Sequence, residues 1–380
     1  MILCEDEAQY RYSKCITQCA HGDVDCFQTC NRVYDAELNE CPCRGGCPNG
    51  CPCPVFDCVD SITTTVAPPT TTNTLGYTTI DPSFDSVLVV NSKGSNLPLL
   101  TDLHGKHDPN LYFEFGENTE VDGSCSIVWQ NQIYIFGGHS KHYQVSRVDN
   151  CVLHGIGNMA ISHVNGACAA IEQKKLVLLC FDSSDTKHGK QCYASNEPLG
   201  FNNLAKINVA QLAEFDHRFT RIAASNENVI AVGGWSPYNA KTEMLSGDNL
   251  TWTSVQDYPY HRDISHASTI YTDDYFYIFG GQSYYSGVPL DIARFHEQKK
   301  HWAKVGSLST ARHGHSVIKL ESPYLESWAF LVVGGKGRKR TEMCEWSSDG
   351  MLLCSEQNPI LNDYDLYPEL FVVPHDYCKF

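Results

Sequence analysis

The sequence lacks the features that mark several common classes of protein. No apolar run approaches the ~18–20 residues that a membrane-spanning helix needs. The 28 basic residues are outnumbered by 44 acidic ones, and the net charge of −16 argues against a nucleic-acid phosphate backbone as the main partner. Gly-x-Ser-x-Gly, His-Glu-x-x-His, P-loop, Gly-x-Gly-x-x-Gly and calcium-loop motifs are also absent. We therefore predict a protein that is not an enzyme, has no cofactor or metal, and neither binds nucleic acid nor inserts into a membrane.

Cysteine, in contrast, is abundant and unevenly spread. Of the 19 cysteines among 380 residues, eleven lie in the first 58 residues. Thiols at this density suit an oxidising compartment, so we predict a secreted, extracellular protein. Because Met1-Ile2-Leu3-Cys4 is too short for the apolar region of a signal peptide, we expect a mature product whose leader was removed.

Residues 1–60 are predicted to form a small disulfide-rich module. Pairs of cysteines four residues apart lie on one face of a helix, which favours a short helical hairpin with the bridges Cys15–Cys30 and Cys19–Cys26. Proline and glycine are dense over 41–54, so a disulfide-held knot of turns is expected there, with a metal–thiolate cluster as the alternative. Eleven is an odd number, and Cys4 is the candidate for a free cysteine or one paired elsewhere.

Residues 61–84 read as a stalk. No charged residue occurs from 61 to 80, and threonine and proline dominate. This composition is typical of an extended, O-glycosylated segment. The predicted acceptors are Thr63, Thr64, Thr65, Thr70, Thr71 and Thr72. The stalk is either a flexible spacer or a segment held by its own propeller or by a neighbouring molecule.

Residues 85–380 contain a repeat. Four apolar strands end in Gly-Gly, with the second glycine at 138, 234, 281 and 335. The intervals of 96, 47 and 54 predict a degenerate copy midway through the longest one, at 176–181, and stepping back one period from 138 gives another at 87–90. Six copies with a period near ~50 residues predict an all-β, six-bladed propeller with four strands in each blade.

At this point the sequence resembles the kelch-repeat β-propellers. The resemblance covers about residues 85–378 and rests on Ala311-Arg312-His313-Gly314-His315-Ser316, on Val332-Val333-Gly334-Gly335 and on Thr251-Trp252. With the cysteine-rich leader, the stalk and Tyr367-Pro368-Glu369-Leu370-Phe371, the whole chain is similar to secreted kelch proteins of invertebrates. Kelch folds host many functions, so the resemblance implies architecture and little more.

The number of residues left after the last glycine pair predicts how the ring closes. We expect 366–373 to form an extra strand beside 87–90, in one sheet with 97–101 and 111–115. Cys344 and Cys354 flank one turn and Cys180 and Cys192 another, so each pair suits a bridge across a hairpin. Cysteines 125, 151, 168 and 378 form an even set whose partners the sequence leaves open. Asn249 begins the N-glycosylation sequon Asn249-Leu250-Thr251.

Repeat geometry places the loops after the glycine pairs on one face, where exposed aromatic residues suit sugars or protein partners. The candidate binding residues are His139, His142, Tyr143, Trp235, Tyr238, Tyr284, Tyr285, Lys336, Arg338, Lys339 and Arg340. Locally packed, solvated loop tips are the alternative. His139 and His142 alone would bind a metal weakly, and His313 and His315 belong to the kelch pattern itself.

Three functions remain open. The first is an extracellular structural protein that self-associates head to tail, through its N-terminal module and stalk, into fibres or matrix. The basic run 336–340 could meet the acidic N-terminal module of another copy. The second is a secreted glycan-binding or adhesion module that uses the loops after the glycine pairs. The third is an oxidase or hydrolase on the propeller. From the sequence we favour the first, with other copies of the chain as partners and glycans as a further possibility.

Overall fold

The computed structural model describes residues 86–90, 99–101, 114–115, 121–149, 151–183, 188–236, 239–321, 328–336, 340–359 and 367–374. The chain divides into two compact units, Met1–Pro82 and Ser83–Phe380. The predicted helical hairpin, the bridges Cys15–Cys30 and Cys19–Cys26, and the threonine stalk lie outside the described residues. So do Tyr238, Arg338 and Lys339 of the predicted binding face.

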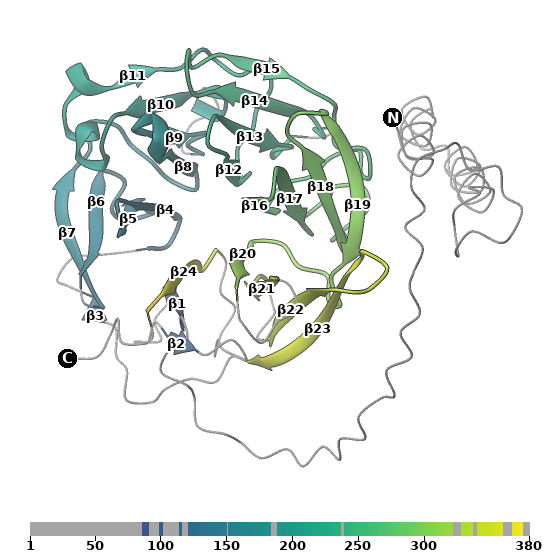
Figure 1. The fold of residues 1–380 in the computed structure, drawn as a ribbon. Coiled ribbons are helices and arrows are strands. Elements are labelled where there is room, and N and C mark those ends of the chain that lie inside the picture. The colour runs from purple at the N-terminus through teal and green to yellow at the C-terminus, as the bar shows by residue number, and fades with distance from the viewer. Residues whose placement is uncertain are drawn as a thin grey trace, which may run out of the picture. The chain divides into compact units, whose positions relative to one another are not determined.

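The described part of the second unit consists of β-strands in five sheets, with only short 3₁₀ helices beside them (Figure 1). The three-stranded sheet, of order β2–β1–β24, contains β1 (Ser86–Val90), β2 (Leu99–Thr101) and β24 (Glu369–Val373). The five-stranded sheet, of order β3–β7–β6–β5–β4, contains β3 (Glu114–Phe115), β4 (Ser124–Trp129), β5 (Gln132–Gly137), β6 (Gln144–Asp149) and β7 (Val152–Asn158).

Two sheets have four strands each. One contains β8 (Ala167–Ile171), β9 (Leu176–Cys180), β10 (Cys192–Ser195) and β11 (Asn208–Val209). The other contains β12 (Ile222–Ala224), β13 (Asn228–Val232), β14 (Thr242–Ser246) and β15 (Trp252–Ser254). The 3₁₀ helices are η1 (Glu172–Lys174), η2 (His188–Lys190), η3 (Pro198–Asn202) and η4 (Leu204–Lys206).

The eight-stranded sheet consists of two antiparallel sets of four strands. The first set contains β16 (Ser268–Thr272), β17 (Tyr275–Phe279), β18 (Asp291–His296) and β19 (His301–Ser307). The second contains β20 (His315–Leu320), β21 (Ala329–Gly334), β22 (Arg340–Trp346) and β23 (Leu352–Pro359). The sets join where β19 and β23 pair in parallel, with Gly306 opposite Leu352. A Cβ at Gly306 would lie 2.4 Å from the Leu352 carbonyl oxygen, so glycine permits this close approach.

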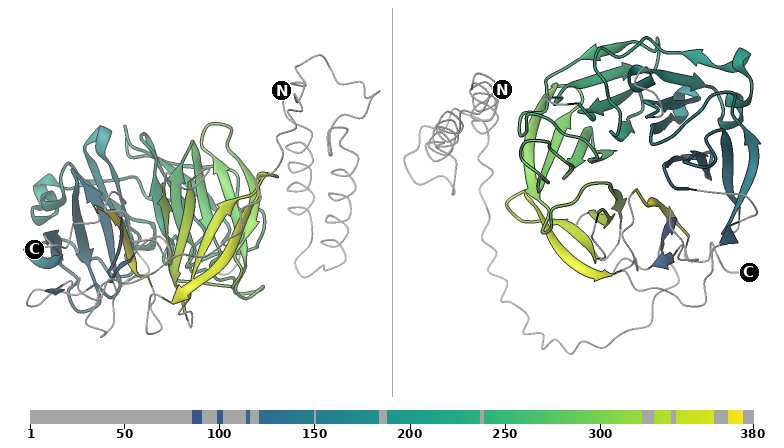
Figure 2. Two further views of the ribbon diagram at one scale, coloured as in Figure 1. Left: turned by 60° about the horizontal axis from the view of Figure 1, so that its bottom comes forward. Right: turned by 180° about the vertical axis from the view of Figure 1, so that it is seen from behind.

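The sheets surround a common centre, giving a β-propeller-like fold (Figures 1 and 2). The strands nearest the centre contact one another in the order β4, β8, β12, β16, β20 and β24. The ring then closes through a hydrogen bond of 2.5 Å that the Ser126 hydroxyl on β4 donates to the Glu369 carboxylate on β24. Segments far apart in the sequence thereby share one centre.

Ring closure follows the prediction in two of its three parts. Strand β24 pairs antiparallel with β1, from Ser86 opposite Val373 to Val90 opposite Glu369, and β2 pairs with the other side of β1. The prediction for 111–115 was wrong, because β3 pairs in parallel with β7 of the neighbouring sheet instead. The β19–β23 junction is also parallel, so an outer strand at the border between two strand sets can pair with either one.

The glycine pairs connect each strand set to the next. In the first three pairs the second glycine donates its N–H to a carbonyl of a following turn: Gly138 to His163 (3.1 Å), Gly234 to Ile264 (2.8 Å) and Gly281 to Arg312 (2.9 Å). The first glycines have positive φ of 50–76°. A Cβ at Gly233 would lie 1.9 Å from the Ile264 carbonyl oxygen, which no side chain tolerates. The motif is thus a backbone junction between strand sets.

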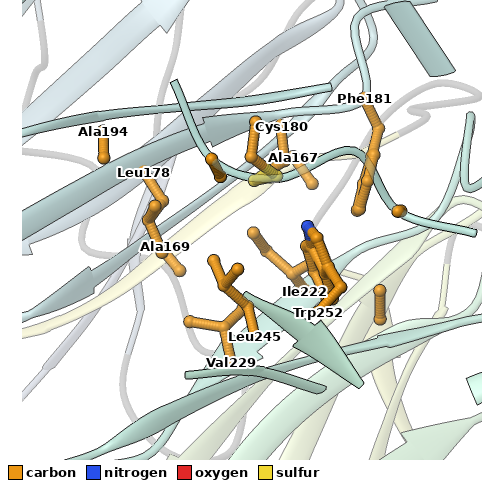
Figure 3. Packing of buried hydrophobic residues seen from close by; sticks show 14 of the residues in the cluster. Ala167, Ala169, Leu178, Cys180, Phe181, Ala194, Ile222, Val229, Leu245 and Trp252 are labelled. Atoms are coloured by element: carbon orange, nitrogen blue, oxygen red, sulfur yellow. A yellow bond between two sulfur atoms is a disulfide. The ribbon is translucent and has the colours of Figure 1, made fainter. Parts of the chain in front are cut away.

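The predicted degenerate copy without glycines is β9. Phe181 follows it with a φ of 61°, within the range of the first glycines, and so takes a conformation that costs a non-glycine residue about 1–2 kcal/mol. Its ring is 1% exposed, and its centroid lies 5.5 Å from that of Trp252 and 5.1 Å from that of His217. Figure 3 shows Phe181 and Trp252 within this apolar cluster. The packing of the Phe181 ring therefore offsets the cost of a positive φ at a position where the other repeats have glycine.

The bridges Cys180–Cys192 and Cys344–Cys354 are present as predicted, each between residues directly opposite on paired strands. Cys125–Cys168, which the sequence left open, joins β4 to β8 and thus two neighbouring sheets. Cys151 is also disulfide-bonded. Within the described ranges, no helix is long and apolar enough to cross a bilayer.

Candidate functional site

The turns that lead into the central strands form a rim around the centre. Six residues of these turns share a positive φ: Gly123 (71°), Asn165 (46°), Phe219 (59°), His266 (55°), Gly314 (65°) and Tyr367 (56°). Backbone hydrogen bonds link them from turn to turn: Asn165 N–H to Gly123 (2.7 Å), His266 to Phe219 (2.7 Å), Gly314 to His266 (2.8 Å) and Tyr367 to Gly314 (2.6 Å). We call these six residues the rim.

The loops after the glycine pairs join the rim. His139, Trp235 and Lys336 each donate a backbone N–H to a turn that leads into a central strand, to the carbonyls of Asp122, Arg218 and His313. The rim and these loops therefore lie on one side of the ring, as the repeat geometry predicts. We call this surface the rim face.

Aromatic rings cover part of the rim face. The ring of His266 stacks on Phe219 (5.1 Å between centroids, 12° between planes) and on Tyr367 (6.0 Å, 23°). Burial, with smaller contributions from His313 and Lys336, lowers the pKa of His266 to about 4, so this ring is neutral at pH 7. Trp235 packs edge-on against Phe219 (6.0 Å) and His266 (5.3 Å) while 49% of it stays exposed. The loop thus holds a tryptophan whose surface faces solvent.

A small pocket, partly open to solvent, adjoins this stack. It is lined by Gly123, Ser124, Asn165, Gly166, Phe219, Thr220, Arg221 and Tyr367. The Arg221 guanidinium lies 5.0 Å from the centre of the Tyr367 ring and donates to Glu369 at 3.2 Å. The charges of this pair offset one another, so the pocket has polar groups without a large net charge.

The hydroxyl of Tyr367 is buried and has no hydrogen-bond partner among the described residues. Burial raises the pKa of Tyr367, while Arg221 lowers it less, so the hydroxyl stays protonated. A buried hydroxyl without a partner costs about 1–3 kcal/mol. The rim face therefore combines aromatic surface with hydrogen-bonding groups.

The other predicted binding residues lie in separate groups. Tyr284 and Tyr285 are 75% and 42% exposed, with ring centroids 5.1 Å apart. Tyr143, which is 53% exposed, lies beside His142. No aromatic contact among the described residues joins these groups to Trp235, so the exposed aromatic residues form separate patches.

The basic run is described only at its ends. Lys336 is exposed and lowers the pKa of both His266 and His313. Arg340 begins β22 and lies 3.6 Å from Glu356. Lys336 therefore belongs to the rim face, whereas Arg340 belongs to an exposed ion pair.

The histidines lend no support to a metal centre. The ring of His142 donates to the backbone carbonyl of His139, and the described ranges contain no group of three His, Cys, Asp or Glu residues that could hold a metal. His315 is fully buried, and burial, with smaller contributions from Arg312 and His313, lowers its pKa to about 3. It is a neutral, buried histidine at a position that the sequence assigned to the repeat pattern.

Sequence reasoning missed the groups that hold the rim turns in place. The carboxylate of Glu342 on β22 accepts hydrogen bonds from the backbone N–H groups of Ser309 (2.6 Å) and Thr310 (3.2 Å). It also forms an ion pair with Arg312 (2.6 Å). On β14, Glu243 does the same with the N–H groups of Glu214 and Phe215 and with His217. The tripeptide Thr-Glu-Met at 242–244 and 341–343 was the signal that could have revealed both.

Asn249 is exposed in the turn between β14 and β15, where its side chain accepts a hydrogen bond from the Thr251 N–H (3.2 Å). A sequon in an exposed turn is accessible to a transferase. Its glycosylation stays a prediction.

Comparisons with known proteins leave the family open. No family model matches the chain, and no curated protein matches it. A solved structure titled "Structure of YjhT" superposes with a TM-score of 0.48 at 11% identity, covering 63% of this chain and 85% of that one. A likeness at this level assigns neither family nor function.

Proposed function

We propose that this protein is a secreted recognition module that binds carbohydrate on the rim face. The observation that carries the proposal is Trp235, which stays half exposed while its ring packs edge-on against Phe219 and His266, and Phe219 also lines the small pocket. A fixed, exposed aromatic ring next to hydrogen-bonding groups matches a sugar, which has apolar C–H faces and polar edges. Such a platform also loses little entropy on binding.

The chemistry of the pocket favours a neutral, hydroxyl-rich ligand. Arg221 and Glu369 neutralise one another, and Asn165 and Thr220 add polar residues to the lining of the same pocket. A strongly charged ligand would have to disrupt the Arg221–Glu369 pair. A sugar can exchange hydrogen bonds with both members of the pair.

The wider setting of the proposal is a six-bladed, kelch-type propeller in an oxidising compartment. Six turns of the rim share one backbone conformation, which supports six blades. The glycine-pair junctions support a kelch-type repeat, and the bridges within and between sheets support secretion.

Head-to-tail self-association, which we favoured from the sequence, depends on the N-terminal module and the stalk. Both lie outside the described residues. It stays a prediction, and the rim face now supports recognition more directly.

A glycan array probed with the purified full chain tests the proposal. We expect hits that Trp235→Ala weakens at least about tenfold and that the matched control Leu204→Ala leaves unchanged. Leu204 is 67% exposed on η4 and lacks the rim contacts, so it controls for the loss of an exposed apolar side chain. An array without hits, or hits that Trp235→Ala leaves unaffected, would rule out carbohydrate recognition on the Trp235 platform.

A further inference from the structure

A serine, a histidine and an aspartate form a hydrogen-bonded chain next to the exposed tyrosines. The hydroxyl of Ser286 lies 3.1 Å from His261 Nδ1, and His261 Nε2 lies 2.6 Å from Asp291 Oδ2. Ser286 is exposed in the turn after the third glycine pair, His261 precedes β16, and Asp291 begins β18. The order Ser–His–Asp is the one that activates a serine for nucleophilic attack.

Asp291 sets the tautomer of the histidine. Burial would raise the pKa of Asp291, but hydrogen bonds from His261 and Lys304 outweigh it and lower the pKa to about 2. The carboxylate is therefore ionised at pH 7 and accepts the proton of Nε2, while Lys304 holds its other oxygen at 2.6 Å. The lone pair of a neutral His261 then lies on Nδ1, facing the Ser286 hydroxyl.

Neighbouring groups hold the histidine and the serine in place. The ring of Tyr258, which is buried, stacks against His261 at 6.1 Å. Asp263 accepts hydrogen bonds from the Ser283 hydroxyl (2.7 Å) and the Tyr284 N–H (2.6 Å), which anchors the turn that carries Ser286. Packing and hydrogen bonds from neighbouring residues therefore position both His261 and the turn that carries Ser286.

We propose that Ser286 is a nucleophile that aryl esters acylate, with His261 as its general base and Asp291 as the positioning residue. Tyr284 and Tyr285 lie immediately before Ser286 and are exposed, so they offer an aromatic surface to the aryl group. This activity is additional to carbohydrate recognition and does not depend on Trp235.

The step conserves atoms and charge. Ser286 Oγ forms a bond to the acyl carbon while its proton passes to His261 Nδ1, and the ester C–O bond breaks. The leaving aryl oxygen takes the proton from His261. Water then attacks the acyl-serine, again through His261, which releases the carboxylic acid and restores the hydroxyl.

The structure also indicates that turnover is slow. The N–H groups of Ser286 and Gly287 donate to the side chain and carbonyl of Ser283, at 3.0 and 3.1 Å, so they are not available to a tetrahedral oxyanion. Preorganised oxyanion donors contribute about 10²–10³ in rate. Both acylation and deacylation pass through such an oxyanion, so we expect both to be slow. Deacylation is the slower step, because the serine oxygen is a poorer leaving group than an aryl oxygen.

The test is covalent labelling of the full chain. With p-nitrophenyl acetate we expect a burst of about one nitrophenolate per chain and an acetyl group on Ser286 by peptide mass spectrometry. A fluorophosphonate probe should label the same residue, forming a phosphorus–oxygen bond and releasing fluoride. Ser286→Ala should abolish both, and His261→Gln should slow acylation about 100-fold.

Two controls separate the inference from its alternatives. Ser254 is exposed and bonded to a carboxylate (Glu214, 2.9 Å) rather than to a histidine, so Ser254→Ala should change nothing. Ser286→Ala should leave glycan-array hits intact, so the two proposals can fail separately. Labelling of other residues, or a Ser286→Ala variant acylated at the wild-type rate, would overturn the proposal.

The positioning role of Asp291 requires an experiment whose result differs from that of a purely structural role. The charged groups against His261 are Asp291 and, behind it, Lys304, whereas the stacked Tyr258 is neutral. Asp291→Asn keeps the shape of the side chain, but its amide can donate to Nε2 and so turn the ring proton of His261 toward Ser286. Acylation should then slow about 100-fold at an unchanged thermal midpoint while Asp291→Glu restores part of the rate, and a wild-type rate in Asp291→Asn would refute the positioning role.

Discussion

Phe181 offers the sharpest test of how the propeller tolerates a repeat without glycines. The residue has a φ of 61° and a ring that is 1% exposed against Trp252 and His217. Two substitutions separate the backbone from the ring. Phe181→Ala removes the ring and keeps a strained backbone, whereas Phe181→Gly removes the ring and relieves the strain.

The magnitudes decide the order of stability. Losing a buried phenylalanine ring costs about 3–5 kcal/mol, and relieving a left-handed conformation returns about 1–2 kcal/mol. Glycine also loses more conformational entropy on folding than alanine, by about 0.5–1 kcal/mol. We therefore expect wild type to be most stable, Phe181→Gly next, and Phe181→Ala least stable by up to about 1.5 kcal/mol.

Urea denaturation with the disulfides intact measures this order, from the midpoint of the main fluorescence transition. A glycine variant as stable as wild type would refute the reasoning, because it would mean that the ring contributes nothing beyond the strain. An alanine variant more stable than the glycine one would refute the assigned strain.

Three further predictions concern the junctions and the buried charges. Gly233→Ala places a Cβ 1.9 Å from a carbonyl oxygen, whereas the Cβ of Gly287→Ala has open space around it. The first variant should therefore lower the thermal midpoint far more than the second. Equal shifts would contradict the role of Gly233 in the junction. Glu342→Gln leaves the buried Arg312 without its counter-charge and should cost about 3–5 kcal/mol in urea denaturation; a loss below ~1 kcal/mol would show that water or a rearranged partner compensates. Burial lowers the pKa of His315 from 6.5 to about 3, so the folded protein binds this proton more weakly than the unfolded chain does. The contribution of neutral His315 to the free energy of unfolding is therefore complete above pH 6.5 and declines as the pH falls toward 3. A thermal midpoint that rises on acidification through this window would contradict the assignment.

Local sequence patterns predicted the repeat well. The spacing of the glycine pairs predicted the strand 176–181, and β9 spans Leu176–Cys180. The length of chain left after the last pair predicted that β24 would close against β1. The hairpin bridges followed from cysteines that flank a turn.

The candidate site was less accessible to sequence reasoning. Trp235 was singled out because it follows a glycine pair, but its partners Phe219 and His266 come from turns where non-glycine residues take a positive φ, which composition does not reveal. Strand β3 was misplaced because two residues carry too little pattern to choose between sheets. Ser286 and His261 meet only in the folded ring and match no motif.

The most direct test of carbohydrate recognition on the rim face is a calorimetric titration of the strongest array ligand into three proteins. The structure predicts that wild type and Leu204→Ala bind with the same Kd and that Trp235→Ala binds at least about tenfold more weakly, with all three showing the same thermal midpoint. Equal affinities for Trp235→Ala and wild type would contradict the account, because the ligand would then bind without the aromatic platform on which the proposal rests.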